Sequence, residues 1–213
     1  MSTPKLNPRG IFFYWIVGLL FIGAVHQQHN NSYKKKYFVE DSSRVYLKGS
    51  SNVNTFSCDC EDRFYEQTLE AQCNGGYARF KNARIHIRAK NFNCHNRKID
   101  ADMQKALMAD QYPEIKVSLE DTWQNAKCLK GECTDWFDVQ ANVNITIAAT
   151  TRKEAVSAKA KVLSPGKILL KGEKALQLSA FGIKPPEAML GMIKVNDYIT
   201  FYFDLVVKIE DSK

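Results

Sequence analysis

Apolar and polar residues alternate along most of this chain, and the longest alternating run lies near its end. The apolar positions of this run are Val195, Ile199, Phe201, Phe203, Leu205, Val207 and Ile209. The positions that alternate with them are mostly polar, among them Tyr198, Thr200 and Tyr202. Alternation over this length predicts a strand with one apolar face and one solvated face. A strand this long belongs in a large antiparallel sheet or in a barrel.

A second long run occupies the middle of the chain. Its apolar face is formed by Phe137, Val139, Ala141, Val143, Ile145, Ile147 and Ala149. After a predicted turn at residues 151–153, the pattern continues through Val156, Ala158, Ala160 and Val162. Small residues recur on this face, at Ala141, Ala149, Ala158 and Ala160. In a closed barrel, small inward side chains leave space that large ones would fill.

The other predicted elements are shorter strands and one helix. The strands lie at residues 37–58, with an interruption at residues 49–51, and at residues 67–73, 83–89 and 115–119. The helix is predicted by apolar residues at helical spacing, which are Ile99, Met103, Ala106 and Leu107, and it ends before Tyr112-Pro113. Leu176 and Leu178 form a short strand before the proline loop of residues 181–186. Seven to nine strands without strand–helix alternation predict an all-β fold with one short helix, whose antiparallel strands close into a barrel of about eight.

Composition sets limits on the domain and its partners. The chain has 213 residues, 45% of them hydrophobic, which is enough for one sizeable core. Lys and Arg number 30 against 23 Asp and Glu, and two of the 30, Lys5 and Arg9, lie in the first 24 residues, which leaves 28 against 23 beyond them. This mild excess fits a protein that works near an anionic membrane surface, and it equally aids solubility. No basic-aromatic motif typical of nucleic-acid binding occurs, so no nucleic-acid partner is predicted.

The N-terminus has the layout of a secretory signal. A positive end at Lys5 and Arg9 precedes an apolar segment at residues 11–25, and Ile22-Gly23-Ala24 is a tolerable cleavage site. The apolar segment is short for a membrane-spanning helix, which needs roughly 20 residues. Residues 1–24 are therefore predicted to be a cleaved signal peptide or an uncleaved anchor, and both alternatives remain open. Residues 25–36 form a polar, basic linker, and residues 37–213 form the domain, exported to the periplasm or cell envelope.

The six cysteines agree with export. They are Cys58, Cys60, Cys73, Cys94, Cys128 and Cys133, and an even count in an exported chain predicts disulfides. Four residues that include a turn glycine separate Cys128 from Cys133, which predicts a bond between them across a hairpin neck. The other four allow three connectivities. A metal site at Cys58, Cys60, Cys94 and His95 is the competing interpretation, but it lacks the spacing of common zinc sites, and no metal is predicted.

No catalytic site is predicted either. Nucleophilic catalysis needs a nucleophile, a base within reach and a group that orients the base. His86 lies among the solvated residues of its strand, and His95 follows Cys94 directly, so in a strand the two would point to opposite faces. No glycine-rich phosphate-binding loop occurs. The chain is therefore predicted to be neither an enzyme nor a cofactor-binding protein.

Four segments in order resemble the YceI-like family of exported lipid-binding proteins. They are residues 41–53 (DSSRVYLKGSSNV), residues 102–107 with Tyr112-Pro113-Glu114-Ile115, residues 181–186 (FGIKPP) and residues 191–197 (GMIKVND). The resemblance covers residues 37–209, and the cysteines depart from it. It implies a lipocalin-like antiparallel β-barrel that holds a long-chain amphiphile, such as a polyisoprenoid quinone or a fatty-acid derivative. The family has no catalytic constellation to carry over.

The candidate ligand-binding residues are the inward residues of the two long strands and the apolar residues of the proline loop: Ala141, Val143, Ile145, Phe181, Ile183, Met189, Phe201 and Phe203. The loop of residues 181–189 is predicted to form the lip of the cavity, where Lys184 would meet a polar head. The alternative is a packed structural or adhesive barrel of the cell envelope with no ligand. The sequence says nothing about oligomeric state.

Overall fold

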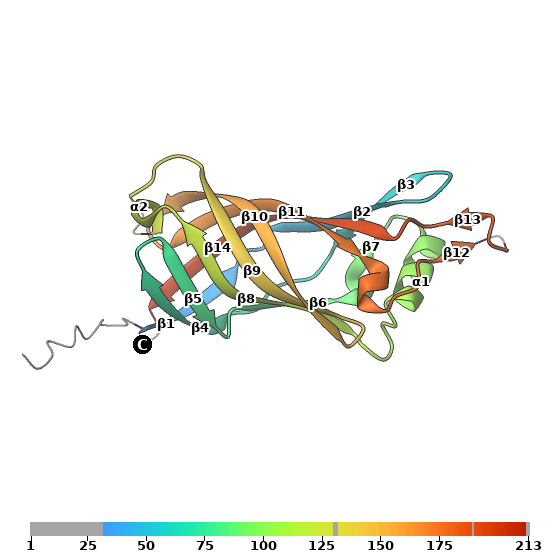
Figure 1. The fold of residues 1–213 in the computed structure, drawn as a ribbon, viewed down its shortest axis with the longest axis horizontal. Helices are drawn as coiled ribbons and strands as arrows, with labels where there is room; N and C mark the ends of the chain where they lie inside the picture. The colour runs from blue at the N-terminus through green and yellow to red at the C-terminus, as the bar shows by residue number, and fades with distance from the viewer. Residues whose placement is uncertain (1–31, 130–131, 189, 212–213) are drawn as a thin grey trace, which may run out of the picture.

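Eight strands form a closed antiparallel ring, which confirms the predicted barrel (Figure 1). The computed structural model describes residues 32–129, 132–188 and 190–211, so the predicted leader lies outside it. Hydrogen bonding follows the ring through β1 (Ser32–Val39), β4 (Gln67–Asn74), β5 (Tyr77–Lys81), β8 (Glu114–Gln124), β9 (Phe137–Ile147), β10 (Thr150–Ser164), β11 (Lys167–Gln177) and β14 (Tyr198–Asp211). Pairing of β1 with β14 closes it.

The long strands β8 and β14 each pair with two partners on the same edge. The second half of β14 pairs with β1, and its first half pairs with β2 (Arg44–Ser50). The second half of β8 pairs with β5, and its first half pairs with β6 (Arg84–Arg88). From β2 the sheet continues through β3 (Thr55–Cys60) to β7 (Phe92–Asn93). The barrel therefore has different strands at its two ends, and the end with β2, β3 and β7 also carries the helix.

The predicted helix is α1 (Arg97–Ala106). The side chain of Asn96 caps it by accepting hydrogen bonds from the backbone N–H groups of Lys98 and Ile99. Three short helical elements were not predicted, the one-turn helix α2 (Ala126–Leu129) and the 3₁₀ turns η2 (Ala89–Asn91) and η3 (Leu178–Phe181), and neither was the ring strand β5. None of the helices in the described ranges has the length and apolar character needed to cross a membrane.

Several element boundaries differ from the sequence expectation. β1 begins at Ser32, because residues assigned to the linker pair with β4 and β14 and their lysines meet acids, in the ion pairs Lys35–Asp211 and Lys36–Glu66. The strand predicted at residues 37–58 is divided among β1, β2 and β3. Leu178 begins a 3₁₀ turn instead of ending a strand. Val195 precedes β14, and β12 (Glu187–Ala188) and β13 (Ile193–Lys194) form a separate small hairpin.

Ala149 was predicted to point into the barrel, and this prediction is wrong. Ala148 and Ala149 are the two residues that connect β9 to β10, and both have positive φ, at 47° and 65°. A two-residue hairpin turn with positive φ at both positions matches the right-handed twist of its strands. The alternation of β9 therefore ends at Ile147, and Ala149 is exposed.

Most of the barrel interior is packed. The main core cluster contains the fully buried side chains of Leu47, Cys58, Phe92, Ile147, Phe181 and Ile183. A smaller cluster of Tyr37, Leu69, Ala71 and Ala83 fills a separate region. Within it the Tyr37 hydroxyl donates to the backbone oxygen of Arg84 and accepts from the backbone N–H of Arg84, so the buried polar group has partners.

The structure contains two disulfides. Cys128 is joined to Cys133 in the connection between β8 and β9, the pair that the sequence spacing predicts. Cys58 of β3 is joined to Cys94, which precedes α1. The sequence left the partners of these two cysteines open. Cys60 and Cys73 are unpaired, although the even count predicted bonds for both. They lie on strands that do not neighbour each other: Cys60 faces Phe92 of β7, whereas Cys73 faces Ala78 of β5.

Cys60 is expected to resist alkylation in the folded protein. Burial raises the pKa of its thiol to about 11 from a usual 9.0. At about pH 8 its thiolate fraction is therefore about a hundredfold below that of an exposed thiol, and alkylation should be slower by about the same factor. The rate should keep rising with pH up to about 11. Differential iodoacetamide labelling with peptide mass spectrometry measures this, with the denatured protein as control, and equal rates in both states would contradict the burial argument.

Candidate functional site

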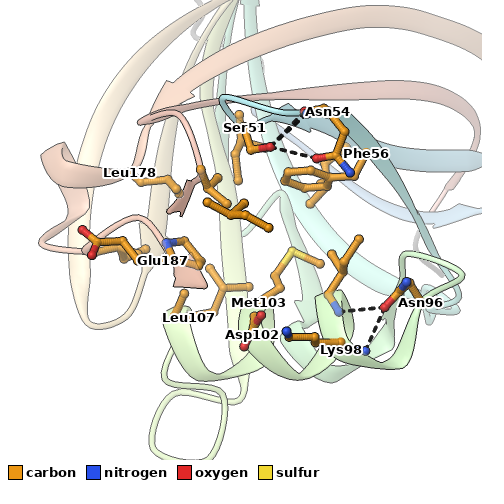
Figure 2. Close-up of a pocket in the computed structure, with 18 of the residues that line it drawn as sticks. Ser51, Asn54, Phe56, Asn96, Lys98, Asp102, Met103, Leu107, Leu178 and Glu187 are labelled. Carbon is orange, nitrogen blue, oxygen red and sulfur yellow. Dashed lines mark hydrogen bonds between the residues drawn. The ribbon is translucent and has the colours of Figure 1, made fainter. Parts of the chain in front are cut away.

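An apolar cavity of about 260 Å³ lies at the α1 end of the barrel. It is enclosed by α1, by the turn between β2 and β3, by the β12–β13 hairpin, and by the strand ends that meet there (Figure 2). Its floor is formed by Leu47, Ile147, Leu176, Ile183, Ile199 and Phe201. Polar groups lie among the lining residues at Ser51, Asn54, Asn96, Lys98, Asp102 and Glu187.

The floor follows directly from strand alternation and register. Leu47 of β2 is paired with Phe201 of β14, and Leu176 of β11 is paired with Ile199 of β14. Paired residues on neighbouring strands project to the same face, so these four side chains form one continuous apolar surface. The Phe201 ring also stands edge-on to Phe92, with ring centroids 6.1 Å apart.

The helix forms the opposite wall. Ile99, Met103, Ala106 and Leu107 lie three or four residues apart, which places them on one face of α1, and all four line the cavity. Two contacts hold the start of the helix in place. Cys94 is joined to β3 through Cys58, and its backbone N–H donates to the Asp100 carboxylate at 2.7 Å. The side chain of Ala106 is small, so it leaves cavity space that a larger residue would fill.

The polar groups at the cavity mouth are partly organised by hydrogen bonds. The Ser51 hydroxyl donates to the Asn54 side-chain oxygen at 2.8 Å, as Figure 2 shows. The Lys184 Nζ lies 3.7 Å from the Glu187 Oε1, and the Lys184 side chain is exposed. This arrangement offers hydrogen-bond donors and charges of both signs around an apolar interior.

The structure brings only part of the predicted lining together. Ile183 and Phe201 line the cavity. The other described candidates, Ala141, Val143, Ile145, Phe181 and Phe203, belong to the packed core or lie against it, and none of them lines the cavity. Met189 lies outside the described residues. Of the predicted lip, residues 181–189, Ile183 contributes to the floor, and Pro186 and Glu187 also line the cavity.

Phe203 fills space in the middle of the barrel, at the level of Gly172. It pairs with Gly172 of β11, and a Cβ added to that glycine would lie 2.5 Å from the tip of the Phe203 ring. The ring therefore occupies the volume that a side chain at position 172 would take. An aromatic residue across a glycine fills this level of the barrel, and the cavity is confined to the end beyond it.

A second, open and polar hollow lies outside the start of α1, with Glu61, Asn93, His95 and Arg97 among its lining residues. Two of its groups have side-chain partners: the Asn93 amide donates to the Glu61 carboxylate, and His95 Nε2 lies 3.1 Å from a carboxylate oxygen of Asp59, which lies outside the hollow. Hydrogen bonds from Arg44 and His95 hold the pKa of Asp59 below its usual value. Within the described ranges, no group of three or more His, Cys, Asp or Glu side chains could hold a metal ion.

Fold and site together define the class of the protein: a closed antiparallel β-barrel with an apolar cavity, shown in Figure 2, that opens at the helix-bearing end. The family model of the YceI-like domain matches residues 39–207, and the chain belongs to that family. This agrees with the resemblance in the four sequence segments. No match was found among curated protein sequences.

Two solved structures share the fold at low sequence identity. One is a polyisoprenoid binding domain from Saccharophagus degradans, with 11% identity and a TM-score of 0.58 over 81% of this chain and 97% of that chain. The other is BcnA from Burkholderia cenocepacia, with 15% identity and a TM-score of 0.51 over 77% of this chain and 95% of that chain. At these identities the similarity shows a common fold and nothing beyond it.

Proposed function

We propose that the protein binds the hydrocarbon chain of an amphiphilic lipid, of polyisoprenoid or fatty-acid type, without catalysing a reaction. The observation that carries the proposal is the partly open apolar cavity with polar groups at its mouth. The family supports it, since one structural relative is named as a polyisoprenoid binding domain. The two disulfides support an oxidising compartment outside the cytoplasm. In this proposal, residues 1–24 direct the export of the domain, either as a signal peptide or as an anchor.

The physical basis of such binding is the removal of apolar surface from water. A hydrocarbon chain has no polar group along its length, so each buried CH₂ contributes about 0.8 kcal/mol and no directional contact is required. Small-molecule sites usually measure about 300–1,000 Å³, and this cavity lies just below that range. It therefore encloses only part of a long chain, and the remainder and the polar head lie at the mouth, near Lys98 and Glu187.

The alternative, a packed structural barrel, is favoured by one observation. Val143, Ile145 and Phe181 are buried in a core without ligand space, as that alternative expects for every inward residue. The end cavity is the feature that it does not explain. A binding measurement separates the two.

A series of saturated fatty acids of increasing length tests the proposal. Affinity should rise about fourfold with each added CH₂ until the cavity is full, and then stay level. Displacement of a polarity-sensitive fluorescent fatty acid from the detergent-free protein measures it. Absence of binding at every length would favour the packed barrel.

A further inference from the structure

The cavity mouth carries an exposed apolar surface, here called the tip, made of the β2–β3 turn at residues 51–54 and the described residues 187–188 and 190–194 of the β12–β13 hairpin. Leu190 is fully exposed, Met192 is 65% exposed and Val53 is 61% exposed. These are the most exposed of the large aliphatic side chains in the described part of the chain. Exposed apolar groups gathered at one site mark an interaction surface more often than scattered ones do.

Hydrogen bonds between the two segments of the tip hold these side chains in place. The Asn52 side chain donates to the backbone oxygen of Met192 at 2.8 Å and accepts from the backbone N–H of Lys194 at 2.9 Å. Ser51 forms a β-bridge with Val195, and the Asn196 side chain donates to the Ser50 hydroxyl. The apolar side chains therefore project from a cross-linked platform, and they do not fold back to cover themselves.

Charges of both signs lie at the tip and beside it, and the lysines Lys98, Lys184 and Lys194 outnumber the acids Asp102 and Glu187, which favours an anionic surface. Lys98 and Lys194 are exposed, and neither forms an ion pair within the described ranges, while Lys184 lies close to Glu187. Cations beside exposed aliphatic residues are the combination that binds anionic membrane surfaces, by insertion together with charge attraction.

We propose that the tip docks on an anionic lipid bilayer and that the bound chain passes between the bilayer and the cavity there. This inference rests on the proposed function. Val53 both lines the cavity and is exposed, so it joins the apolar interior to the docking surface. A chain that leaves beside Val53 enters the bilayer without crossing water. Both ends of the described chain lie at the opposite end of the barrel, where Lys35 pairs with Asp211, so they leave the tip free (Figure 1).

The test is vesicle binding by a double variant, Leu190→Asn with Met192→Asn. Neither residue lines the cavity, and Leu190 has a φ of 56°, a conformation that asparagine adopts more readily than leucine, so the variant should fold. Co-sedimentation with vesicles of phosphatidylcholine and phosphatidylglycerol should show at least about a tenfold loss of binding, since two inserted side chains are removed. Lys194→Gln should reduce the preference for these vesicles over pure phosphatidylcholine.

Leu163→Asn is the matched control, because Leu163 is an exposed leucine near the far end of β10, and it should bind vesicles like the wild type. Fatty-acid binding in vesicle-free buffer should be equal in the wild type and the double variant. Two outcomes would overturn the docking inference alone. One is equal vesicle binding by the wild type and the double variant, and the other is a wild type that binds fatty acid but not vesicles. A wild-type dimer that the double variant converts to monomer would overturn it too, in favour of a self-interface. If the wild type binds vesicles as expected but neither it nor any variant binds fatty acid, the proposed function would instead be rejected.

Discussion

Replacement of Cys58 and Cys94 together by alanine is expected to lower the free energy of unfolding by about 4 kcal/mol. The bond joins residues 36 positions apart, and the loop entropy that a cross-link removes from the unfolded chain grows with loop length. Both side chains are buried, and alanine is apolar, so the replacement places no unpaired polar group in the core. Chemical denaturation of the wild type and the double variant measures the difference.

The second disulfide supplies the comparison. Cys128 and Cys133 are only 5 positions apart, and their replacement by alanine should cost about 2 kcal/mol. The Cys58–Cys94 bond also anchors the chain that leads into α1, so its loss alone should weaken fatty-acid binding. An equal effect of both double variants on stability, with no effect of either on binding, would contradict this view of the bond.

Ala106→Phe is expected to reduce lipid affinity about thirtyfold while the protein stays folded. Ala106 lies on the cavity face of α1, and a phenyl ring there takes the space of about two to three chain CH₂ groups, worth about 2 kcal/mol of binding. Because the ring fills existing space, the melting temperature should hold or rise. Fluorescent fatty-acid titration and thermal melts measure the two effects.

Ala101→Phe is the matched control on the same helix. Ala101 is exposed, so the same change in helix propensity occurs without any change in the cavity. Its affinity should equal that of the wild type. If both variants bind equally well, the ligand lies elsewhere; if Ala106→Phe unfolds the protein, the space beside α1 is already filled.

The long strands and the helix could be predicted from the sequence because each depends on a local period. β9 and β14 alternate over most of their length, and α1 has apolar residues at helical spacing with a stop before Pro113. The exceptions arise from contacts between distant segments. The lysines at the start of β1 belong to a strand only because β4 and β14 lie on either side of them, and a local pattern carries no trace of that.

The location of the cavity could not be predicted in the same way. Alternation assigns Val143 and Phe201 to the inward face, but it says nothing about their height along the barrel axis. Packing at each height depends on which residues meet across the sheet, such as Phe203 with Gly172. The cavity wall on α1 was visible in the sequence only as an apolar helix face, which is equally typical of a packed core.

The central claim is that the end cavity holds the chain of a lipid, and lipid extraction tests it most directly. The wild type, Ala106→Phe and Ala101→Phe are purified from cells without detergent, and the extracts are analysed by mass spectrometry. We expect a stoichiometric chain lipid in the wild type and in Ala101→Phe, and its loss from Ala106→Phe. No lipid in any of the three, or the same lipid in all of them, would contradict it.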